Sequence, residues 1–300
     1  MMQAVRLPVN EVSVRELDAL IRLVEDPDPN IFGQVRNELL NLGPRVVPVL
    51  ESGSQNTIGT EHQFRIQDII REIRLTYAKS ELEKWRQSSN RDLLRGCMII
   101  SKFQDPSIDE AAVEAELERI KQKIWLEINE ENTAFETVKI FNQVLFDQCG
   151  FKSSRTNFYS PQNSCIHHVL ETKVGNPLSL SVIYSILAQK LHIPIYGVNL
   201  PNHFVLGFVD EYRTLKMLGL EEDRSILFYI NPFSKGRIFD HNEIENYLRS
   251  LGLPLQKDYF EPCSNTDILR RILTNLSYAC GKDGDFARVE ELKEIQSVLI

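Results

Sequence analysis

Apolar residues recur at helical spacing through the start of the chain. Leu17, Ile21, Val35 and Leu39 follow one another at intervals typical of a buried helix face within residues 14–51. The segment DPDPN interrupts this pattern and supplies capping oxygens, and LGP ends the second run before RVVPVL. The pattern predicts two helices and a short third one.

The helical period continues over residues 62–88 and 108–149, which are rich in strong helix formers. The first half of the chain is therefore predicted to be all helical. Its leading hairpin resembles one unit of a HEAT-type repeat. No second copy of the DPDP and LGP signals follows, so a solenoid is not predicted.

The pattern changes in residues 150–165, GFKSSRTNFYSPQNSC, whose composition indicates a long loop. VGNPLSLSVIYSILAQKLHIP then predicts a buried helix, with Asn176 as N-cap and Pro177 at its first position. Three strand-like runs follow: IPIYGVNL, HFVLGFVD and SILFYINPF. The tail predicts two helices that are broken at GKDGD.

The predicted fold class is α+β, with an antiparallel sheet in the core. Residues 1–88 form the helical, HEAT-like N-terminal region in this prediction, residues 89–260 form the core, and residues 261–300 form a helical tail of TPR-like character. A chain of 300 residues is long enough for such a division.

Composition narrows the classes of partner. No run approaches the roughly 18 apolar residues of a membrane helix, and the N-terminus lacks the apolar core of a signal peptide. The formal charge is −8, and the basic residues are interleaved with acidic ones, which argues against nucleic-acid binding. We expect a cytoplasmic protein with neither a membrane nor a nucleic acid as partner.

Cofactor and metal sites have little support in the sequence. The cysteines are widely spaced and include no CxxC, which predicts reduced thiols, without a disulfide framework or a structural zinc site. His167 and His168 would point apart on either a strand or a helix, so a shared metal is not predicted. The nucleotide-binding motifs GxxxxGK[ST] and GxGxxG are both absent from the sequence. We therefore predict no cofactor.

The residues with chemical potential lie at the start of the buried helix and on two strands. His203 opens HFVLGFVD and Asn231 ends SILFYIN, and we expect the two to lie side by side. Papain-like and transglutaminase-like enzymes place a nucleophile at a helix start facing such a pair. There the helix dipole lowers the pKa of the nucleophile, the histidine takes its proton, and the third residue orients the imidazole.

VLETKVGNPLSLS, PNHF and NPFSKG together resemble the bacterial transglutaminase-like family named for an invasion-gene regulator B product, whose core also occurs in a eukaryotic F-box protein. The family's pattern is a VLE-x-x-x-G-x-P-x-SLS helix, a PxHF strand and a DPF-x-x-G strand. NFYSPQNS fits its upstream loop. The resemblance covers about residues 15–290 and implies a transglutaminase-like or papain-like core.

Two departures from active transglutaminase-like enzymes bear on function. Pro177 stands where those enzymes start the helix with cysteine, and the family shares this loss. Asn231 stands where the family has aspartate, although asparagine can still hold a histidine. The resemblance therefore implies a pseudoenzyme, which has lost catalysis and binds a protein or peptide partner.

An enzymatic alternative stays open. Ser179 or Cys165 could serve as the nucleophile of a hydrolase or acyl-transferase, with His203 and Asn231 as its partners. The competing interpretation makes Ser179 a helix-terminal hydroxyl bonded to backbone and Cys165 a small buried apolar residue. A third possibility, a structural module for assembly, requires a large exposed apolar patch.

Overall fold

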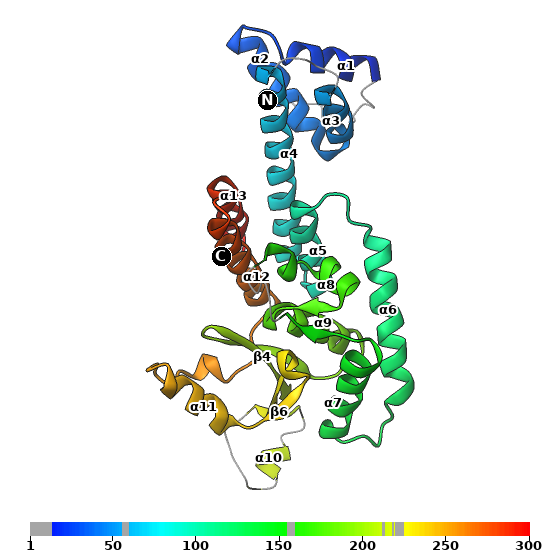
Figure 1. Ribbon diagram of the computed structural model, residues 1–300, viewed down its shortest axis with the longest axis vertical. Coiled ribbons are helices and arrows are strands. Elements are labelled where there is room, and N and C mark those ends of the chain that lie inside the picture. The colour runs from blue at the N-terminus through cyan, green and yellow to red at the C-terminus, as the bar shows by residue number, and fades with distance from the viewer. Residues whose placement is uncertain (1–13, 56–59, 155–159, 212–213, 218, 220–224) are drawn as a thin grey trace, which may run out of the picture. The chain divides into compact units, whose positions relative to one another are not determined.

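A computed structural model describes residues 14–55, 60–154, 160–211, 214–217, 219 and 225–300 (Figure 1). The N-terminal segment, predicted to carry no export signal, and part of the NFYSPQNS loop lie outside the described residues. The chain divides into two compact units, Met1–Glu81 and Leu82–Ile300. The boundaries predicted from sequence, after residues 88 and 260, stay predictions. None of the described helices is long and apolar enough to cross a membrane.

The first unit is helical. It contains α1 (Val14–Leu23), α2 (Pro29–Leu42), η1 (Gly43–Val46), α3 (Val47–Gln55) and most of α4 (Thr60–Gln87). The Asp28 side chain accepts the Asn30 backbone N–H at the start of α2, and Gly43, at a φ of 69°, ends that helix. The capping oxygen from DPDPN and the end of the helix at LGP were both predicted from sequence. Assignment of the hairpin to the HEAT class stays a prediction.

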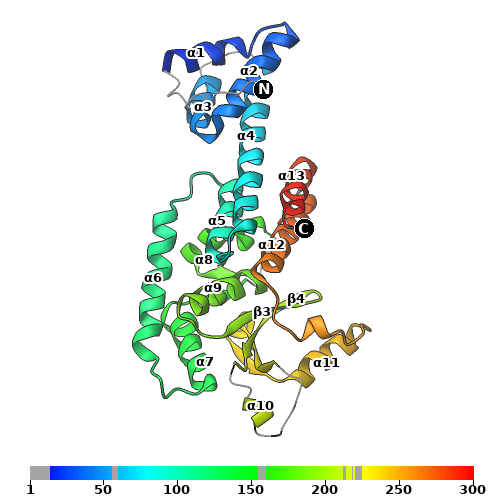
Figure 2. The same cartoon turned by 180° about the vertical axis from the view of Figure 1, so that it is seen from behind.

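The second unit is mostly helical and contains one antiparallel sheet, which agrees with the predicted α+β class. Its helices are α5 (Leu93–Gln104), α6 (Glu110–Glu127), α7 (Ala134–Asn142), η2 (Gln143–Gln148), η3 (Pro161–Ser164), α8 (Ile166–Thr172), α9 (Pro177–Lys190), α10 (Thr214–Met217), η4 (Pro232–Ser234), α11 (His241–Ser250), η5 (Lys257–Tyr259), α12 (Asn265–Lys282) and α13 (Phe286–Ser297). The tail forms the helix pair α12 and α13, which lie side by side in both views (Figures 1 and 2).

The sheet has the strand order β3 (Ile195–Leu200), β4 (His203–Val209), β5 (Ile226–Asn231) and β6 (Arg237–Phe239), and all neighbours are antiparallel. β1 (Lys152–Ser153) and β2 (Val174–Gly175) form a short parallel pair, and β2 lies just before α9 in sequence. Because each predicted strand run follows the previous one through a short or polar connection, the meander could be predicted from sequence.

Helices cover the sheet and bury its apolar strands. Helix α9 packs against β3 and β4, and its residues 178–188 are all buried. Helix α11 contributes Ile244 and Leu248 to a cluster with Val198, Val205 and Tyr229. Figures 1 and 2 show α9 and α11 on either side of the strands. Since both faces are covered, β4 is nearly continuous in apolar residues rather than alternating.

Glu116 connects α6 to the segment that precedes α9. Its carboxylate accepts a hydrogen bond from Arg119 at 2.7 Å and another from Lys173. These donors, Arg119 first, hold the pKa of Glu116 at about 2, below its usual 4.5. A carboxyl whose folded pKa is depressed stabilises the fold fully above its unfolded pKa, and that stabilisation is lost as pH falls towards the folded pKa.

The substitution Glu116→Gln should therefore lower the free energy of unfolding by about 1 kcal/mol at neutral pH, after allowance for solvent screening. Urea denaturation at several pH values measures this difference, which should shrink between about pH 4.5 and pH 2. Glu118→Gln, which removes an exposed partner of Lys121 on the same helix, should have a much smaller effect. If the effect of Glu116→Gln is constant over this pH range, the carboxyl of Glu116 does not have a depressed pKa in the folded protein.

Candidate functional site

The start of α9 is fixed by a reciprocal cap. Asn176 accepts the Ser179 backbone N–H at 2.9 Å, and the Ser179 hydroxyl accepts the Asn176 backbone N–H at 3.0 Å. Pro177 occupies the first helical position, where its missing N–H is no loss. The N-cap and first residue predicted from sequence are thus confirmed.

The structure brings His203 and Asn231 together. β4 begins at His203 and the neighbouring antiparallel strand β5 ends at Asn231, so the two residues share one end of the sheet. Nε2 of His203 lies 3.3 Å from Nδ2 of Asn231. An exchange of the amide's nitrogen and oxygen would keep the contact, with Asn231 accepting instead of donating. The contact occupies Nε2, so Nδ1 is the ring nitrogen that would exchange a proton with a ligand.

Electrostatics favour a neutral imidazole at this position. Burial, and then the positive charge of Arg271, hold the pKa of His203 below its usual value. The Tyr247 ring, 6.3 Å away between centroids, also lies near the imidazole. A neutral imidazole can accept a proton, so the residue retains the chemical property of a general base.

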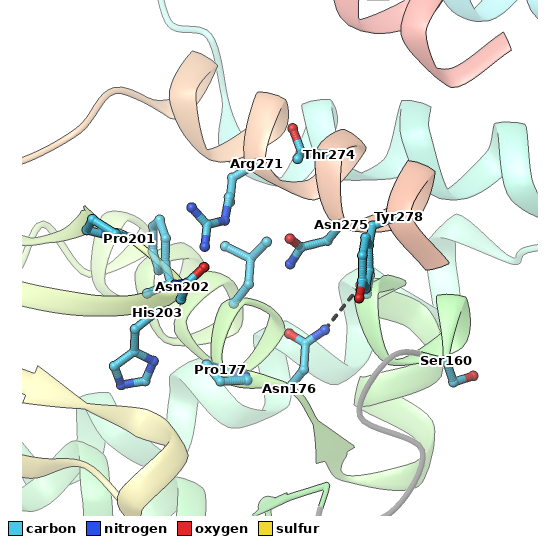
Figure 3. A pocket seen from close by; sticks show the side chains of 13 residues that line it. Ser160, Asn176, Pro177, Pro201, Asn202, His203, Arg271, Thr274, Asn275 and Tyr278 are labelled. Atoms are coloured by element: carbon cyan, nitrogen blue, oxygen red, sulfur yellow. Dashed lines mark hydrogen bonds between the residues drawn. The ribbon is translucent and has the colours of Figure 1, made fainter. Parts of the chain in front are cut away.

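Pro177 and His203 both line a cavity of about 610 Å³ (Figure 3). Its walls come from the start of α9, from η3 and the residue before it, from the β3–β4 connection, and from one side of α12. The lining residues are Ser160, Ser164, Asn176, Pro177, Leu178, Pro201, Asn202, His203, Phe204, Arg271, Thr274, Asn275 and Tyr278. Among these described residues there is no cysteine, and Ser179 is not one of them.

The two alternative nucleophiles are buried elsewhere. The Ser179 hydroxyl is engaged in the cap and also lies 3.3 Å from the Asn176 carbonyl oxygen. Sγ of Cys165 lies 3.5 Å from the Pro161 carbonyl oxygen, and burial raises the pKa of this thiol to about 12. Neither side chain lines the cavity of His203. Their catalytic roles stay predictions.

Replacing Ser179 with alanine should lower the free energy of unfolding by about 1–2 kcal/mol, because the buried Asn176 N–H loses its acceptor. Urea denaturation measures the loss. Ser181→Ala is the matched control: this buried hydroxyl donates to the Pro177 carbonyl at 2.7 Å within the helix, and its removal should cost less. A variant Ser179→Ala of unchanged stability would contradict the capping role.

The wall supplied by α12 had no signal in the sequence. Arg271, Thr274 and Asn275 lie in a tail that was predicted only as helical, and no local pattern shows which of its residues return to the start of α9. Among the described residues, no group of three or more His, Cys, Asp or Glu side chains could hold a metal ion. The five cysteines are all described and form no disulfide.

Comparison with protein families gives one match. A model described as the transglutaminase-like superfamily matches residues 111–274, more than half of the chain. The matched range includes the start of α9, His203, Asn231 and the cavity wall at Arg271.

Relatives occur among bacterial and eukaryotic proteins. A UPF0162 protein of Xylella fastidiosa is 28% identical over 190 residues, 61% of this chain and 63% of that protein. A UPF0162 protein of Vibrio cholerae is 25% identical over 191 residues, 63% of this chain and 66% of that protein. F-box only protein 21 of Mus musculus is 32% identical over 135 residues, 45% of this chain and 20% of that protein. The chain therefore spans less than two thirds of the length of each of these relatives. No solved structure matches the chain.

Proposed function

The chain belongs to the transglutaminase-like superfamily, and from this premise we propose that it is a non-catalytic member that binds a protein or peptide partner. One observation carries the proposal. Pro177 occupies the start of α9, where active transglutaminase-like enzymes have a nucleophilic cysteine, and it lines the same cavity as His203. Proline has no nucleophilic group, so the histidine has no thiol to deprotonate at the start of this helix.

The cavity itself supports a binding role. Its volume of about 610 Å³ falls within the usual range for ligand sites. Most of its lining side chains are polar, and Leu178, Pro201 and Phe204 add apolar surface. Similarity to an F-box protein adds support for a protein partner. We also propose that the HEAT-like region of residues 1–88 and the TPR-like tail of residues 261–300 provide further contact surfaces for the partner. The proposed location is the cytoplasm. The proposed family within the superfamily is the one named for the invasion-gene regulator B product.

The alternative is a hydrolase or acyl-transferase that uses Ser179 or Cys165 with His203 and Asn231. Retention of the His203–Asn231 contact favours it. The capped hydroxyl of Ser179 and the raised pKa of Cys165 weigh against it, because both nucleophiles would have to leave buried positions before reacting.

Capture of peptides tests the proposal. The full chain is immobilised and incubated with a synthetic library of N-acetylated hexapeptides of randomised sequence, and bound and unbound peptides are identified by mass spectrometry. We expect the wild type and His203→Ala to capture the same peptides and to leave them chemically unchanged. Asn275→Trp, which fills the cavity from α12, should capture about tenfold less.

The matched control is Arg270→Trp, which adds the same side chain at an exposed position of the same helix and should capture peptides normally. Cleaved or joined peptides formed by the wild type and absent with His203→Ala would contradict the proposal and support the enzyme. Failure of the wild type to capture any peptide would contradict a peptide-binding role.

A further inference from the structure

Arg271 brings a positive charge into the cavity. Its guanidinium points from α12 towards the side of the cavity that holds Asn202 and His203 (Figure 3). Nη1 donates to Oδ1 of Asn199 at 3.2 Å. A guanidinium has five N–H donors, and the described part of the chain provides no other hydrogen-bond acceptor and no acidic side chain for it.

Several other arginines of the second unit have acidic partners. Arg119 pairs with Glu116, Arg237 with Glu243, and Arg288 with Glu291. The described residues that line the cavity include no aspartate or glutamate. In a chain with a formal charge of −8, a half-buried arginine without an acidic partner is an exception.

Partial burial removes some of the water around the Arg271 guanidinium, and this desolvation of the charge is unfavourable when the cavity holds no anion. Desolvation lowers the pKa of Arg271, although an arginine side chain stays protonated at neutral pH. An anion bound beside the guanidinium would compensate this desolvation, because buried charges are stable when they are paired and hydrogen-bonded. Burial, and then the charge of this guanidinium, lower the pKa of His203, which favours a neutral imidazole without a second positive charge.

We propose that the cavity binds a carboxylate group of its ligand, with Arg271 as the charged partner and the side-chain amides of Asn202 and Asn275 as further donors. The planar guanidinium matches a carboxylate through two parallel hydrogen bonds. One cation balances the single charge of a carboxylate, whereas a phosphate monoester carries roughly −1.5 to −2 at neutral pH. Leu178, Pro201 and Phe204 provide apolar surface for the rest of the ligand. This inference rests on the proposed binding function of the same cavity.

The test uses the hexapeptide library in two isotopically distinguished versions, one with a free C-terminal carboxylate and one with a C-terminal carboxamide. Mixed in equal amounts, they compete for the immobilised full chain, and mass spectrometry gives the ratio captured. The wild type should enrich the free acids by about tenfold, which corresponds to one charge-assisted contact. Arg271→Gln should lose this enrichment, while Arg271→Lys should keep part of it.

Arg270→Gln is the matched control, because it removes the exposed arginine next to Arg271 and should leave the enrichment unchanged. If the wild type instead captures carboxamides that contain aspartate or glutamate, and Arg271→Gln does not, the carboxylate comes from a side chain and the inference still holds. Equal capture of both versions without any preference for acidic residues overturns it, and so does enrichment that survives Arg271→Gln. Both of these outcomes leave peptide binding intact.

A second arm separates failure of this inference from failure of the proposed function. The protein is titrated with benzoate and with inorganic phosphate, and the ring proton signals of His203 are followed by NMR. A saturable shift with benzoate that is absent in Arg271→Gln supports a carboxylate site for small molecules, even if no peptide is captured. A shift with phosphate alone, or a response to neither probe together with no peptide capture, overturns the inference.

Discussion

Replacing Gly236 with alanine is expected to lower the free energy of unfolding by about 3 kcal/mol. Gly236 has a φ of 69°, a conformation that costs an alanine about 1 kcal/mol. A Cβ at this position would lie 1.8 Å from Oδ1 of Asn142, so that side chain would have to move. Asn142 would then lose its hydrogen bond to the Gly236 carbonyl, 2.8 Å long, and its contact with the Tyr184 hydroxyl. Tyr184 is fully buried, so the lost partner would not be replaced by water.

The same substitution should also disturb the site. The Gly236 backbone N–H donates to the Asn231 carbonyl at 2.9 Å, so a shift of this turn displaces the residue that contacts His203. Urea denaturation measures the stability, and the ring proton signals of His203 report the displacement. Gly252→Ala is the matched control, because Gly252 has a φ of 67° but nothing lies within 4 Å of the position that a Cβ would take there. It should cost only about 1 kcal/mol. Equal costs at the two glycines would contradict the role of Asn142.

Replacing Pro177 with cysteine is expected to create a highly reactive thiol. The new side chain would stand at the first position of α9, where the helix dipole stabilises a thiolate, and in the cavity that His203 lines. Near pH 6 we expect iodoacetamide to alkylate it on the order of a hundredfold faster than an ordinary thiol, because most of it would be thiolate.

Native and engineered thiols provide the comparison. Burial raises the pKa of Cys165 and of Cys263 to about 12, so these residues should react slowly. Thr274→Cys is the matched control, since it places a thiol in the same cavity but in the body of α12. Peptide mapping after timed alkylation gives the rates. If the Pro177→Cys thiol reacts no faster than the Thr274→Cys thiol, or equally fast without His203, then α9 and His203 do not retain the geometry of a thiol active site.

Local signals explain which parts of the fold could be predicted. The start of α9 was predictable because asparagine and proline act on the residues next to them, and the strands β3 to β5 because they follow one another in sequence. Helix α5 was not recognised as a separate element. From Leu93 to Phe103 nearly all of its residues are buried, so no polar face reveals the helical period. Strand β6 is three residues long, too short for an alternating pattern.

The residues of the candidate site also fall into a group that could be predicted from sequence and a group that could not. His203 and Asn231 could be named because each stands in a short motif beside a recognisable strand. Arg271 could not, because its place in the cavity depends on how α12 packs against η3, β3 and α5. Packing between segments distant in sequence leaves no periodic signal in either segment. The tail was therefore predicted as a helix pair without a function.

Our central prediction is that His203 activates no nucleophile in its cavity, although Ser160, Ser164, Thr274 and Tyr278 bring hydroxyl groups to the walls. Its most direct test treats wild-type protein and His203→Ala separately with a fluorophosphonate and with iodoacetamide, and locates any label by intact mass and peptide mapping. We predict that no serine or cysteine is labelled in a manner that depends on His203. Labelling of a single residue, Ser179 or Cys165, that disappears in His203→Ala would contradict this prediction and identify the protein as an enzyme.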